Sequence, residues 1–245
     1  MHTITIHSTG HSYSCAPDTT ILKAGLDGGL FMPYSCRSGV CKTCRGKVVQ
    51  GEVDYGGVHP KYLSEADKAQ GYALLCCAKP MSDLVIDVQE IDAGDAIRSK
   101  FMPVRILKLQ KAAPDVMIVT LGLPMNEPTV FRAGQYIEFV RPDGTRRSYS
   151  MANAPSNDGV RQLELHVRMI PGGKFTDLVF NHLHVRDVQR IEMPLGSFFL
   201  REKSDKPMVM LASGTGFAPI KSIIEYALQR GIRRPITLFW GGRRR

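Results

Sequence analysis

Four cysteines constrain this chain more strongly than any other feature. Three lie within the segment Cys36-Arg-Ser-Gly-Val-Cys41-Lys-Thr-Cys44, and a fourth, Cys76, follows much later. A Cys-x4-Cys-x2-Cys spacing with a distant fourth cysteine is the ligand pattern of a plant-type [2Fe–2S] cluster. Soft thiolates bind the irons and balance their positive charge. The loop must wrap closely around such a cluster, and Gly39 lets backbone N–H groups turn towards the inorganic sulfides.

A zinc site is the main alternative for the same four residues. Structural zinc sites usually carry two separate Cys-x2-4-Cys pairs, and a triple followed by one distant ligand matches that pattern poorly. Position alone leaves two choices for the fourth ligand, because Cys76 and Cys77 are adjacent. The spacing therefore favours one-electron chemistry over a structural metal ion.

The composition of the 245 residues excludes other classes. Hydrophobic residues make up 43% and charged residues 22%, as in ordinary globular proteins. No segment approaches the ~18 consecutive apolar residues of a membrane span. The start, Met1-His-Thr-Ile-Thr-Ile-His, lacks the basic and apolar regions of a secretion signal. Four of the six cysteines have metal-type spacing, so we expect a reducing compartment, the cytoplasm, rather than a disulfide framework.

The net charge of +9 is divided unevenly along the chain. Residues 1–92 carry −2, and residues 93–245 carry +11. A basic half can indicate nucleic-acid binding, but these arginines are scattered through strand-like segments without a recognition helix or an aromatic stacking pattern. Anionic cofactor phosphates and a mildly acidic neighbouring module explain the excess as well. We therefore expect no nucleic-acid partner.

The pattern of the chain changes twice, which predicts a multidomain α+β protein. Residues 1–92 mix short strands and helices as a compact ferredoxin module does, and residues 93–102 form a linker. Residues 103–201 contain alternating strands separated by turn residues, which predicts a small antiparallel β-barrel. Residues 206–245 contain an apolar strand, a glycine turn, an amphipathic helix and a second apolar strand, which together make one βαβ unit of a parallel sheet.

Local signals predict the individual elements. In the first module we expect a hairpin around Gly10, a helix over 20–28, a capped helix start at Ser64 and strands over 45–49 and 83–90. Later segments predict strands over 104–108, 116–123, 136–140, 147–151, 162–169, 188–193, 208–212 and 236–240, and helices over 175–183 and 219–229.

A short motif in the barrel region suits a flavin. Arg147-Ser-Tyr149-Ser150 ends a hairpin strand and follows Gly134-Gln-Tyr136. A guanidinium can pair with a flavin phosphate in forked geometry, a tyrosine ring can stack on the isoalloxazine, and a serine hydroxyl can hydrogen-bond near N5. Alone, the motif also fits an exposed strand arginine beside a packed tyrosine. Its position between the cysteine module and the glycine turn favours the flavin.

Several segments resemble one family along the whole chain. Tyr72-Ala-Leu-Leu-Cys76-Cys-Ala-Lys-Pro80 resembles the Leu-x-Cys-x-x-x-Pro segment of plant-type ferredoxins, which implies that Cys76 is the ligand. Cys77 and Cys15 are then expected to be small buried residues. The order of cysteine module, Arg-x-Tyr-Ser barrel and Gly-Thr-Gly-x-Ala-Pro turn is similar to the ferredoxin–NADP⁺ reductase superfamily. Within it, the chain most resembles CDP-6-deoxy-Δ3,4-glucoseen reductases and also the reductase components of aromatic-ring dioxygenases and monooxygenases.

The resemblance implies the fold and the cofactors. It implies a β-grasp ferredoxin domain with a [2Fe–2S] cluster, an antiparallel barrel with FAD and an incomplete parallel α/β domain for NADH or NADPH. The metal ligands that it implies are Cys36, Cys41, Cys44 and Cys76. The cofactor-binding residues that it implies are Arg147, Tyr149, Ser150, His166, Gly172, Gly173, Thr176, Gly214, Thr215, Gly216 and Pro219.

These residues take different expected roles. The Arg147–Ser150 motif contacts the flavin, with Ser150 near N5. The segment from Gly172 to Thr176 opens a helix, where free N–H groups form an anion site for a second phosphate contact. His166 lies on the strand that passes the cofactor, with ordinary barrel packing as the alternative. The Gly214–Pro219 turn lies between a strand and a helix, where it can receive a nucleotide pyrophosphate.

The expected activity is that of an NAD(P)H-dependent oxidoreductase. Electrons would pass from NAD(P)H through FAD to the cluster and on to a separate dehydratase or oxygenase component. No catalytic acid or base is expected, because the cofactors carry the chemistry. Family nucleotide domains continue with more βα units and a late Cys-Gly-x-Pro segment, so we expect a C-terminally truncated domain with uncovered apolar sheet faces. A non-catalytic electron relay that cannot use NAD(P)H is the alternative from another class.

Overall fold

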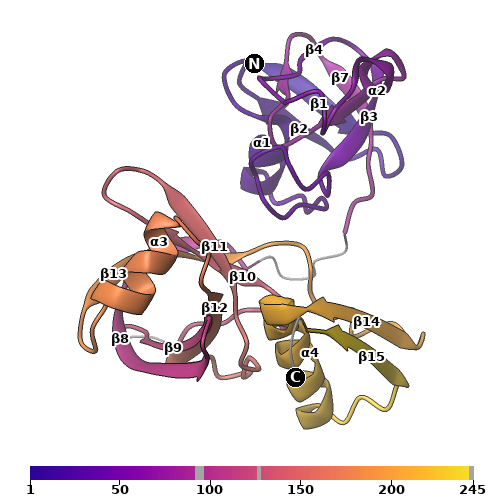
Figure 1. The fold of residues 1–245 in the computed structure, drawn as a ribbon. Helices are drawn as coiled ribbons and strands as arrows, with labels where there is room; N and C mark the ends of the chain where they lie inside the picture. The colour runs from indigo at the N-terminus through magenta and orange to yellow at the C-terminus, as the bar shows by residue number, and fades with distance from the viewer. Residues whose placement is uncertain (92–96, 126–127, 243–245) are drawn as a thin grey trace. The chain divides into compact units, whose positions relative to one another are not determined.

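The computed structural model describes residues 1–91, 97–125 and 128–242. The chain divides into two compact units (Figure 1). The first comprises Met1–Ala96 with the short segment Gly196–Phe198, and the second comprises Ile97–Leu195 with Phe199–Arg245. The part of the expected linker over 93–96 lies outside the described residues.

The first unit is a five-stranded sheet that packs against a helix. The strands have the order β2-β1-β7-β3-β5, in which β1 and β7 are parallel and the other neighbours antiparallel. This is the expected β-grasp arrangement. The bounds are β1 His2–Ile6, β2 Ser12–Cys15, β3 Arg45–Gln50, β5 Tyr72–Leu74 and β7 Leu84–Asp87, with a separate pair β4 Val53–Asp54 and β6 Lys79–Pro80.

Two helices of this unit begin where the sequence predicts. Helix α1 spans Ile21–Asp27, and the Thr20 hydroxyl accepts a hydrogen bond from the Lys23 N–H at 3.4 Å. Helix α2 spans Glu65–Ala69 and has a capping box, in which Ser64 and Asp67 exchange side-chain and backbone hydrogen bonds. Both caps satisfy N–H groups that the first helical turn leaves without partners.

The second unit contains a six-stranded antiparallel barrel. Its strands have the order β11-β10-β13-β8-β9-β12. A bridge between Met151 and Leu165 joins the two edge strands, and the Ala152 N–H donates to the Glu164 carbonyl at 2.7 Å. The bounds are β8 Lys100–Ala113, β9 Val116–Gly122, β10 Tyr136–Val140, β11 Arg146–Ser150, β12 Gln162–Arg168 and β13 Val188–Leu195.

Two barrel elements differ from their predicted form. Strand β8 is much longer than the predicted 104–108 and begins at Lys100, inside the expected linker, because it pairs with both β13 and β9. The predicted helix over 175–183 is a short α3, Lys174–Asp177, that continues as a π-helix, Leu178–His182. Phe175 and Val179 of this segment are buried in the barrel core.

The last segment is a βαβ unit. Strands β14, Met208–Ser213, and β15, Ile236–Gly241, are parallel, and helix α4, Phe217–Gln229, follows the 3-10 turn Gly214–Gly216. Ile220, Ile223 and Ala227 of the helix are buried against this small sheet. Other apolar side chains of the strands are exposed, as expected for an incompletely covered sheet: Val209 is 67% exposed and Leu211 76%.

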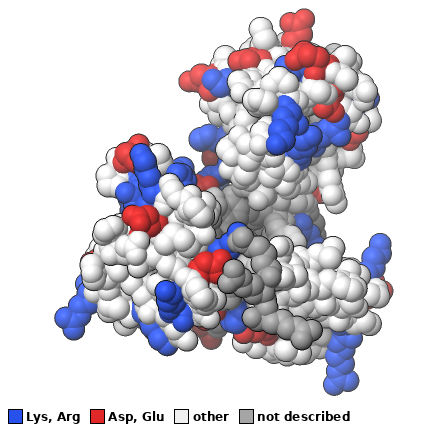
Figure 2. Space-filling model, viewed as in Figure 1, with Lys and Arg blue, Asp and Glu red and all other residues white. Residues whose placement is uncertain are grey.

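No helix in the described residues has the length and apolar character to cross a membrane. On the face drawn in Figure 2, Lys and Arg side chains stand in separate groups interrupted by uncharged and acidic residues.

Candidate functional site

The four predicted ligand cysteines lie together in the first unit as two pairs. Cys36 interacts with Cys41, and Cys44 interacts with Cys76. The Cys36 N–H also points at the Cys41 sulfur, at 3.5 Å. A [2Fe–2S] cluster takes four thiolates, two on each iron, so this pairing suits two irons. Among the described residues, no three or more His, Cys, Asp or Glu side chains meet where they could hold one metal ion.

The backbone of the cysteine loop aims N–H groups at sulfur. The loop has positive φ at Arg37, Gly39 and Lys42, at 53°, 75° and 61°. Partial burial raises the pKa of the Cys36 thiol, but hydrogen bonds from Ser38, Cys41 and the Val40 backbone outweigh it and lower the pKa to about 6. The thiolate is the form that binds iron. The donor set and the loop conformation therefore fit the cluster.

Cys76 and Cys77 differ in their surroundings, although their sulfur atoms lie only 3.6 Å apart. Cys76 is buried and shares a hydrogen bond with Cys44, which lowers the pKa of Cys44 and raises that of Cys76. Burial raises the pKa of Cys77 to about 12. Cys77 is half-buried rather than buried as predicted, and its sulfur would lie 2.9 Å from a Cβ at Gly39. Cys15 is fully buried, as predicted.

Gly39→Ala is expected to reduce cluster content strongly. A Cβ at this position would lie 2.9 Å from the Cys77 sulfur, on a backbone with a φ of 75° that L-residues avoid. Iron and acid-labile sulfide per chain measure the effect. Gly57→Ala is the control, because a Cβ there meets no atom within 4 Å. Normal cluster content in Gly39→Ala would contradict the close packing, and Cys77→Ala in the same chain should restore part of the loss.

The flavin motif lies on strand β11 at the edge of the barrel sheet. Arg147 is exposed, and its guanidinium donates to the neighbouring Arg146 carbonyl at 2.7 Å. Tyr149 packs against Phe139 and Phe175, with ring centroids 6.0 Å and 5.5 Å away, and burial raises its pKa to about 12. Ser150 is half-buried opposite Tyr136. Arg147 is an exposed cation that could meet a flavin phosphate, and the half-buried Tyr149 ring beside it could meet the flavin ring.

The second predicted phosphate segment forms a tight turn before α3. Gly172 has a φ of 73°, with open space where a side chain would be, and Gly173 is the N-cap. Thr176 is buried, and its hydroxyl accepts from the Ile170 N–H at 3.2 Å. The Thr176 hydroxyl is therefore engaged within the turn, and so is the Gly173 N–H, which donates to the Ile170 carbonyl at 2.9 Å; Gly172 is the exposed glycine of this segment.

The predicted nucleotide turn is bonded to Trp240 and lies near Arg168 of the barrel. Gly214, Thr215 and Gly216 form the 3-10 turn, and Pro219 lies in the first turn of α4. The Trp240 indole N–H donates to the Gly214 carbonyl at 3.1 Å, and its ring stacks on Phe217 at 4.3 Å between centroids. From the barrel, the Arg168 guanidinium reaches within 3.6 Å of the place where a Gly214 Cβ would lie. The turn thus lies beside a barrel cation that could face a pyrophosphate.

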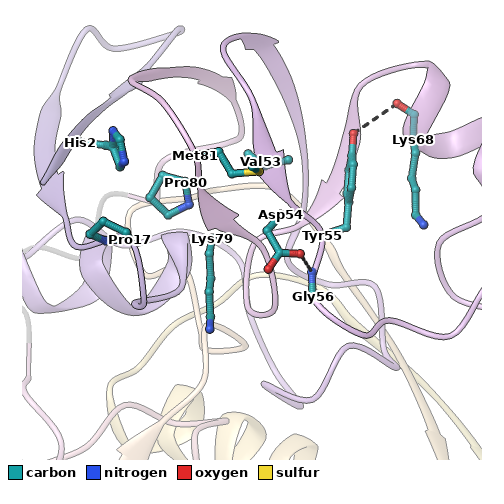
Figure 3. Close-up of a pocket in the computed structure, with 10 residues that line it drawn as sticks. All are labelled: His2, Pro17, Val53, Asp54, Tyr55, Gly56, Lys68, Lys79, Pro80 and Met81. Atoms are coloured by element: carbon teal, nitrogen blue, oxygen red, sulfur yellow. Dashed lines mark hydrogen bonds between the residues drawn. The ribbon is translucent and has the colours of Figure 1, made fainter.

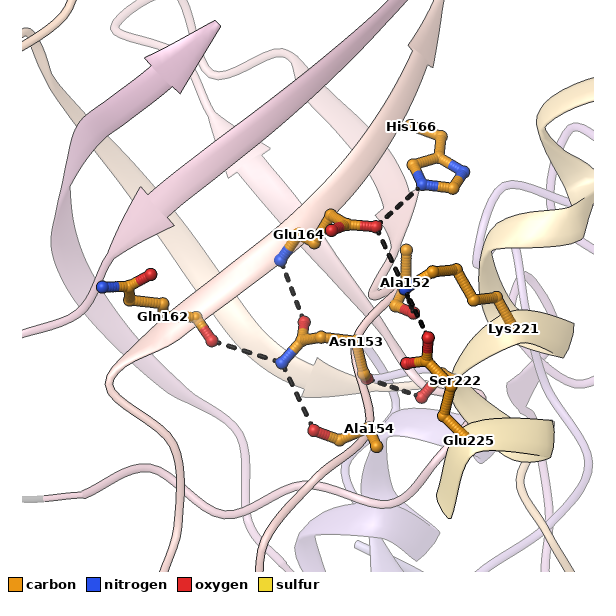
Figure 4. A network of polar contacts seen from close by, with 9 residues as sticks. All are labelled: Ala152, Asn153, Ala154, Gln162, Glu164, His166, Lys221, Ser222 and Glu225. Carbon is orange, nitrogen blue, oxygen red and sulfur yellow. Dashed lines mark hydrogen bonds and ion pairs between the residues drawn. The ribbon is translucent and has the colours of Figure 1, made fainter. Parts of the chain in front are cut away.

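His166 belongs to a polar network that the sequence analysis did not find (Figure 4). Its ring nitrogen lies 3.0 Å from the Glu164 carboxylate, which also lies 3.3 Å from the Lys221 ammonium. The signal available in the sequence was the alternation of β12, in which polar residues 164, 166 and 168 share one face. The structure thus places His166 between the barrel and the nucleotide segment.

A groove of about 810 Å³ in the first unit contains none of the predicted site residues (Figure 3). Asp54, Tyr55, Lys68 and Lys79 lie along it. The Asp54 carboxylate accepts from the Gly56 N–H at 2.9 Å, and the Tyr55 hydroxyl donates to the Lys68 carbonyl at 3.5 Å. The Asp54 carboxylate and the Tyr55 hydroxyl therefore have hydrogen-bond partners within the fold.

Three family models match successive parts of the chain. They are a 2Fe-2S iron-sulfur cluster binding domain over residues 4–81, an oxidoreductase FAD-binding domain over 103–200 and an oxidoreductase NAD-binding domain over 210–245. Together with the paired cysteines and the barrel, they define an NAD(P)H-dependent oxidoreductase with an iron–sulfur cluster and a flavin.

The chain belongs to the ferredoxin–NADP⁺ reductase superfamily, in the group of reductases that carry a [2Fe–2S] domain. It is 38% identical to the CDP-6-deoxy-L-threo-D-glycero-4-hexulose-3-dehydrase reductase of Yersinia pseudotuberculosis, over 97% of this chain and 70% of that protein. It is also 38% identical to reductase component 1 of a Comamonas terephthalate 1,2-dioxygenase, over 99% of this chain and 70% of that protein.

A solved structure shares this fold. The crystal structure of the Amycolatopsis cytochrome P450 reductase GcoB matches with a TM-score of 0.79 at 39% identity, covering 100% of this chain and 73% of that one. A ferredoxin reductase of carbazole 1,9a-dioxygenase matches with a TM-score of 0.69 at 26% identity, covering 99% and 71%.

Proposed function

We propose that this protein is a reductase component that takes electrons from NADH or NADPH and delivers them singly to a separate acceptor protein. The observation that carries the proposal is the pairing of the four cysteines in a chain that also contains the flavin barrel and the nucleotide turn. Bound FAD supplies the conversion between a two-electron hydride donor and a one-electron cluster.

The side chains hold and orient the cofactors in this proposal. Cys36 and Cys41 would hold one iron, and Cys44 and Cys76 the other. Arg147 would pair with the flavin phosphate, Tyr149 would cover the ring, and Ser150 would donate near N5. Gly172 would offer its N–H group to the same phosphates, with Gly173 and Thr176 keeping that turn closed. Gly214, Thr215, Gly216 and Pro219 would hold the nucleotide pyrophosphate, and His166 would line the path between the two sites.

Two acceptor classes are equally supported. One relative is named as the reductase of a hexulose dehydrase, and another as the reductase component of a dioxygenase. The acceptor is therefore a dehydratase or an oxygenase component. The cytoplasm is the proposed location, because a thiolate-bound cluster and free cysteines suit a reducing compartment.

Anaerobic addition of NADH or NADPH is expected to bleach the visible absorbance of the purified protein. The flavin band should fade first and the cluster band after it, because the electrons reach the cluster through the flavin. Dithionite, which needs no nucleotide site, is the control. Bleaching by dithionite but by neither nucleotide would favour a non-catalytic electron relay, and a colourless protein containing zinc would reject both.

A further inference from the structure

One face of strand β12 is polar and is turned away from the barrel core. Leu163, Leu165 and Val167 are fully buried in the core, whereas Glu164, His166 and Arg168 alternate with them and are half-buried. Because successive strand residues point to opposite faces, these three polar side chains share one side of the strand. Helix α4 and the glycine turn lie on that side, where Lys221 contacts Glu164 (Figure 4).

Lys221 joins three segments through one ammonium group. Its Nζ lies 3.3 Å from the Glu164 carboxylate on β12 and 2.9 Å from the Glu225 carboxylate, one turn further along α4. It also donates to the Ala152 carbonyl at 3.2 Å. All three donor positions of the ammonium therefore have an acceptor.

A second set of hydrogen bonds runs beside the first. Ser222 is fully buried, and its hydroxyl donates to the Asn153 carbonyl at 2.8 Å. The Asn153 side chain accepts from the Glu164 N–H at 2.9 Å and donates to the Gln162 carbonyl at 3.3 Å. The loop after β11 is thus fixed to both β12 and α4.

Both charges of the central pair persist at neutral pH. A hydrogen bond from His166 and the nearby Lys221 charge outweigh burial and lower the pKa of Glu164 to about 2. Burial alone would lower the pKa of Lys221, but Glu225 and Glu164 outweigh it and raise the pKa. Partly buried ion pairs are screened less than exposed ones, so this contact differs from an ordinary surface pair.

The residues of this network lie close in sequence to the flavin motif and to the glycine turn. Ala152 and Asn153 follow the Arg147–Ser150 flavin motif after one residue, and Lys221 and Ser222 lie in the helix that begins directly after the Gly214–Gly216 turn. The network is therefore a short connection between the two segments that we assign to the flavin and to the nucleotide.

We infer that Lys221 is a positioning residue that fixes the nucleotide turn relative to the flavin strand through Glu164 and Ala152. The inference rests on the proposed function, because it concerns the geometry of hydride transfer within that site. A misplacement of about 1 Å between reacting groups can cost on the order of 100-fold in rate. Loss of the Lys221 contacts would therefore affect the rate of flavin reduction more than nucleotide binding.

The test compares four variants of the full chain. Lys221→Met removes the charge at similar length, Lys221→Arg retains it, and Glu164→Gln removes the opposite charge without changing shape. Lys206→Met is the control, because Lys206 is an exposed lysine of the same unit. Amide hydrogen exchange of residues 150–154 and 214–229 is followed by mass spectrometry, and flavin reduction by NADH is measured anaerobically.

We expect faster exchange in both segments for Lys221→Met and Glu164→Gln, and wild-type exchange for Lys221→Arg and Lys206→Met. The maximal rate of flavin reduction should fall roughly 10- to 100-fold in the first two variants, with a smaller change in KM and unchanged reduction by dithionite. Wild-type exchange in Lys221→Met would overturn the inference, as would altered exchange with an unchanged reduction rate. If neither NADH nor NADPH reduced the wild-type protein, the proposed function would fail, and faster exchange in Lys221→Met would still support the ordering of both segments by Lys221.

Discussion

Replacing Cys76 with serine is expected to remove the iron–sulfur absorbance of the protein, whereas replacing Cys77 with serine is expected to retain it. Cys76 interacts with Cys44 and so completes the second pair of thiols. Without Cys76, one iron keeps a single cysteine thiolate, whereas the cluster takes two thiolates on each iron. Near-complete loss of iron and acid-labile sulfide is the expected magnitude.

The adjacent cysteine makes this comparison stringent. The two sulfur atoms are 3.6 Å apart, so a small shift could exchange their roles. Cys77→Ser and Cys15→Ser remove a thiol of the same unit without removing a predicted ligand. Loss of the cluster in Cys77→Ser with retention in Cys76→Ser would reverse the assignment. Flavin content should stay constant in all three variants, because the flavin motif belongs to the other unit.

Arg147→Ala is expected to weaken FAD binding by roughly 10- to 100-fold, which corresponds to the ~1.5–3 kcal/mol of a hydrogen bond to a charged group. Arg147 is exposed on β11 beside Tyr149, where its guanidinium can reach a phosphate in forked geometry. The flavin-to-protein ratio after gel filtration and a titration of the apoprotein with FAD both measure the effect.

Arg141→Ala is the matched control for this variant. Arg141 belongs to the same hairpin; hydrogen bonds from Thr145 lower the pKa of Asp143 there, and both arginines add to that effect. The two variants lose the same charge, so a general electrostatic effect on FAD would appear in both. An equal loss of FAD in Arg141→Ala, or unchanged flavin content in Arg147→Ala, would argue against a phosphate contact at Arg147. Cluster content should remain at the wild-type level in both.

Features with a local cause were predicted well from the sequence. The helix that begins near residue 20, the cap at Ser64 and the alternation of β12 each depend on residues within a few positions of one another. The three cofactor-binding domains were also predicted, because their motifs occur in a fixed order, and the family models confirm the cofactors. The individual binding residues stay predictions.

Features that depend on distant partners were missed. The length of β8 follows from pairing with β13 and β9, which local alternation does not reveal. The contact between Glu164 and Lys221 joins a barrel strand to a helix far along the chain, and each residue alone resembles an ordinary surface charge. The assignment of Thr176 to a phosphate stays a prediction, and its hydroxyl bonds within its own turn, to Ile170 and Gly173.

Trp240 is the single tryptophan of the sequence, and it lies against the glycine turn with its indole N–H bonded to Gly214. All of the intrinsic indole emission of this protein therefore originates beside the segment that we assign to the nucleotide. The molecule carries its own optical label at that place, so occupancy of the turn can be followed without attaching a dye.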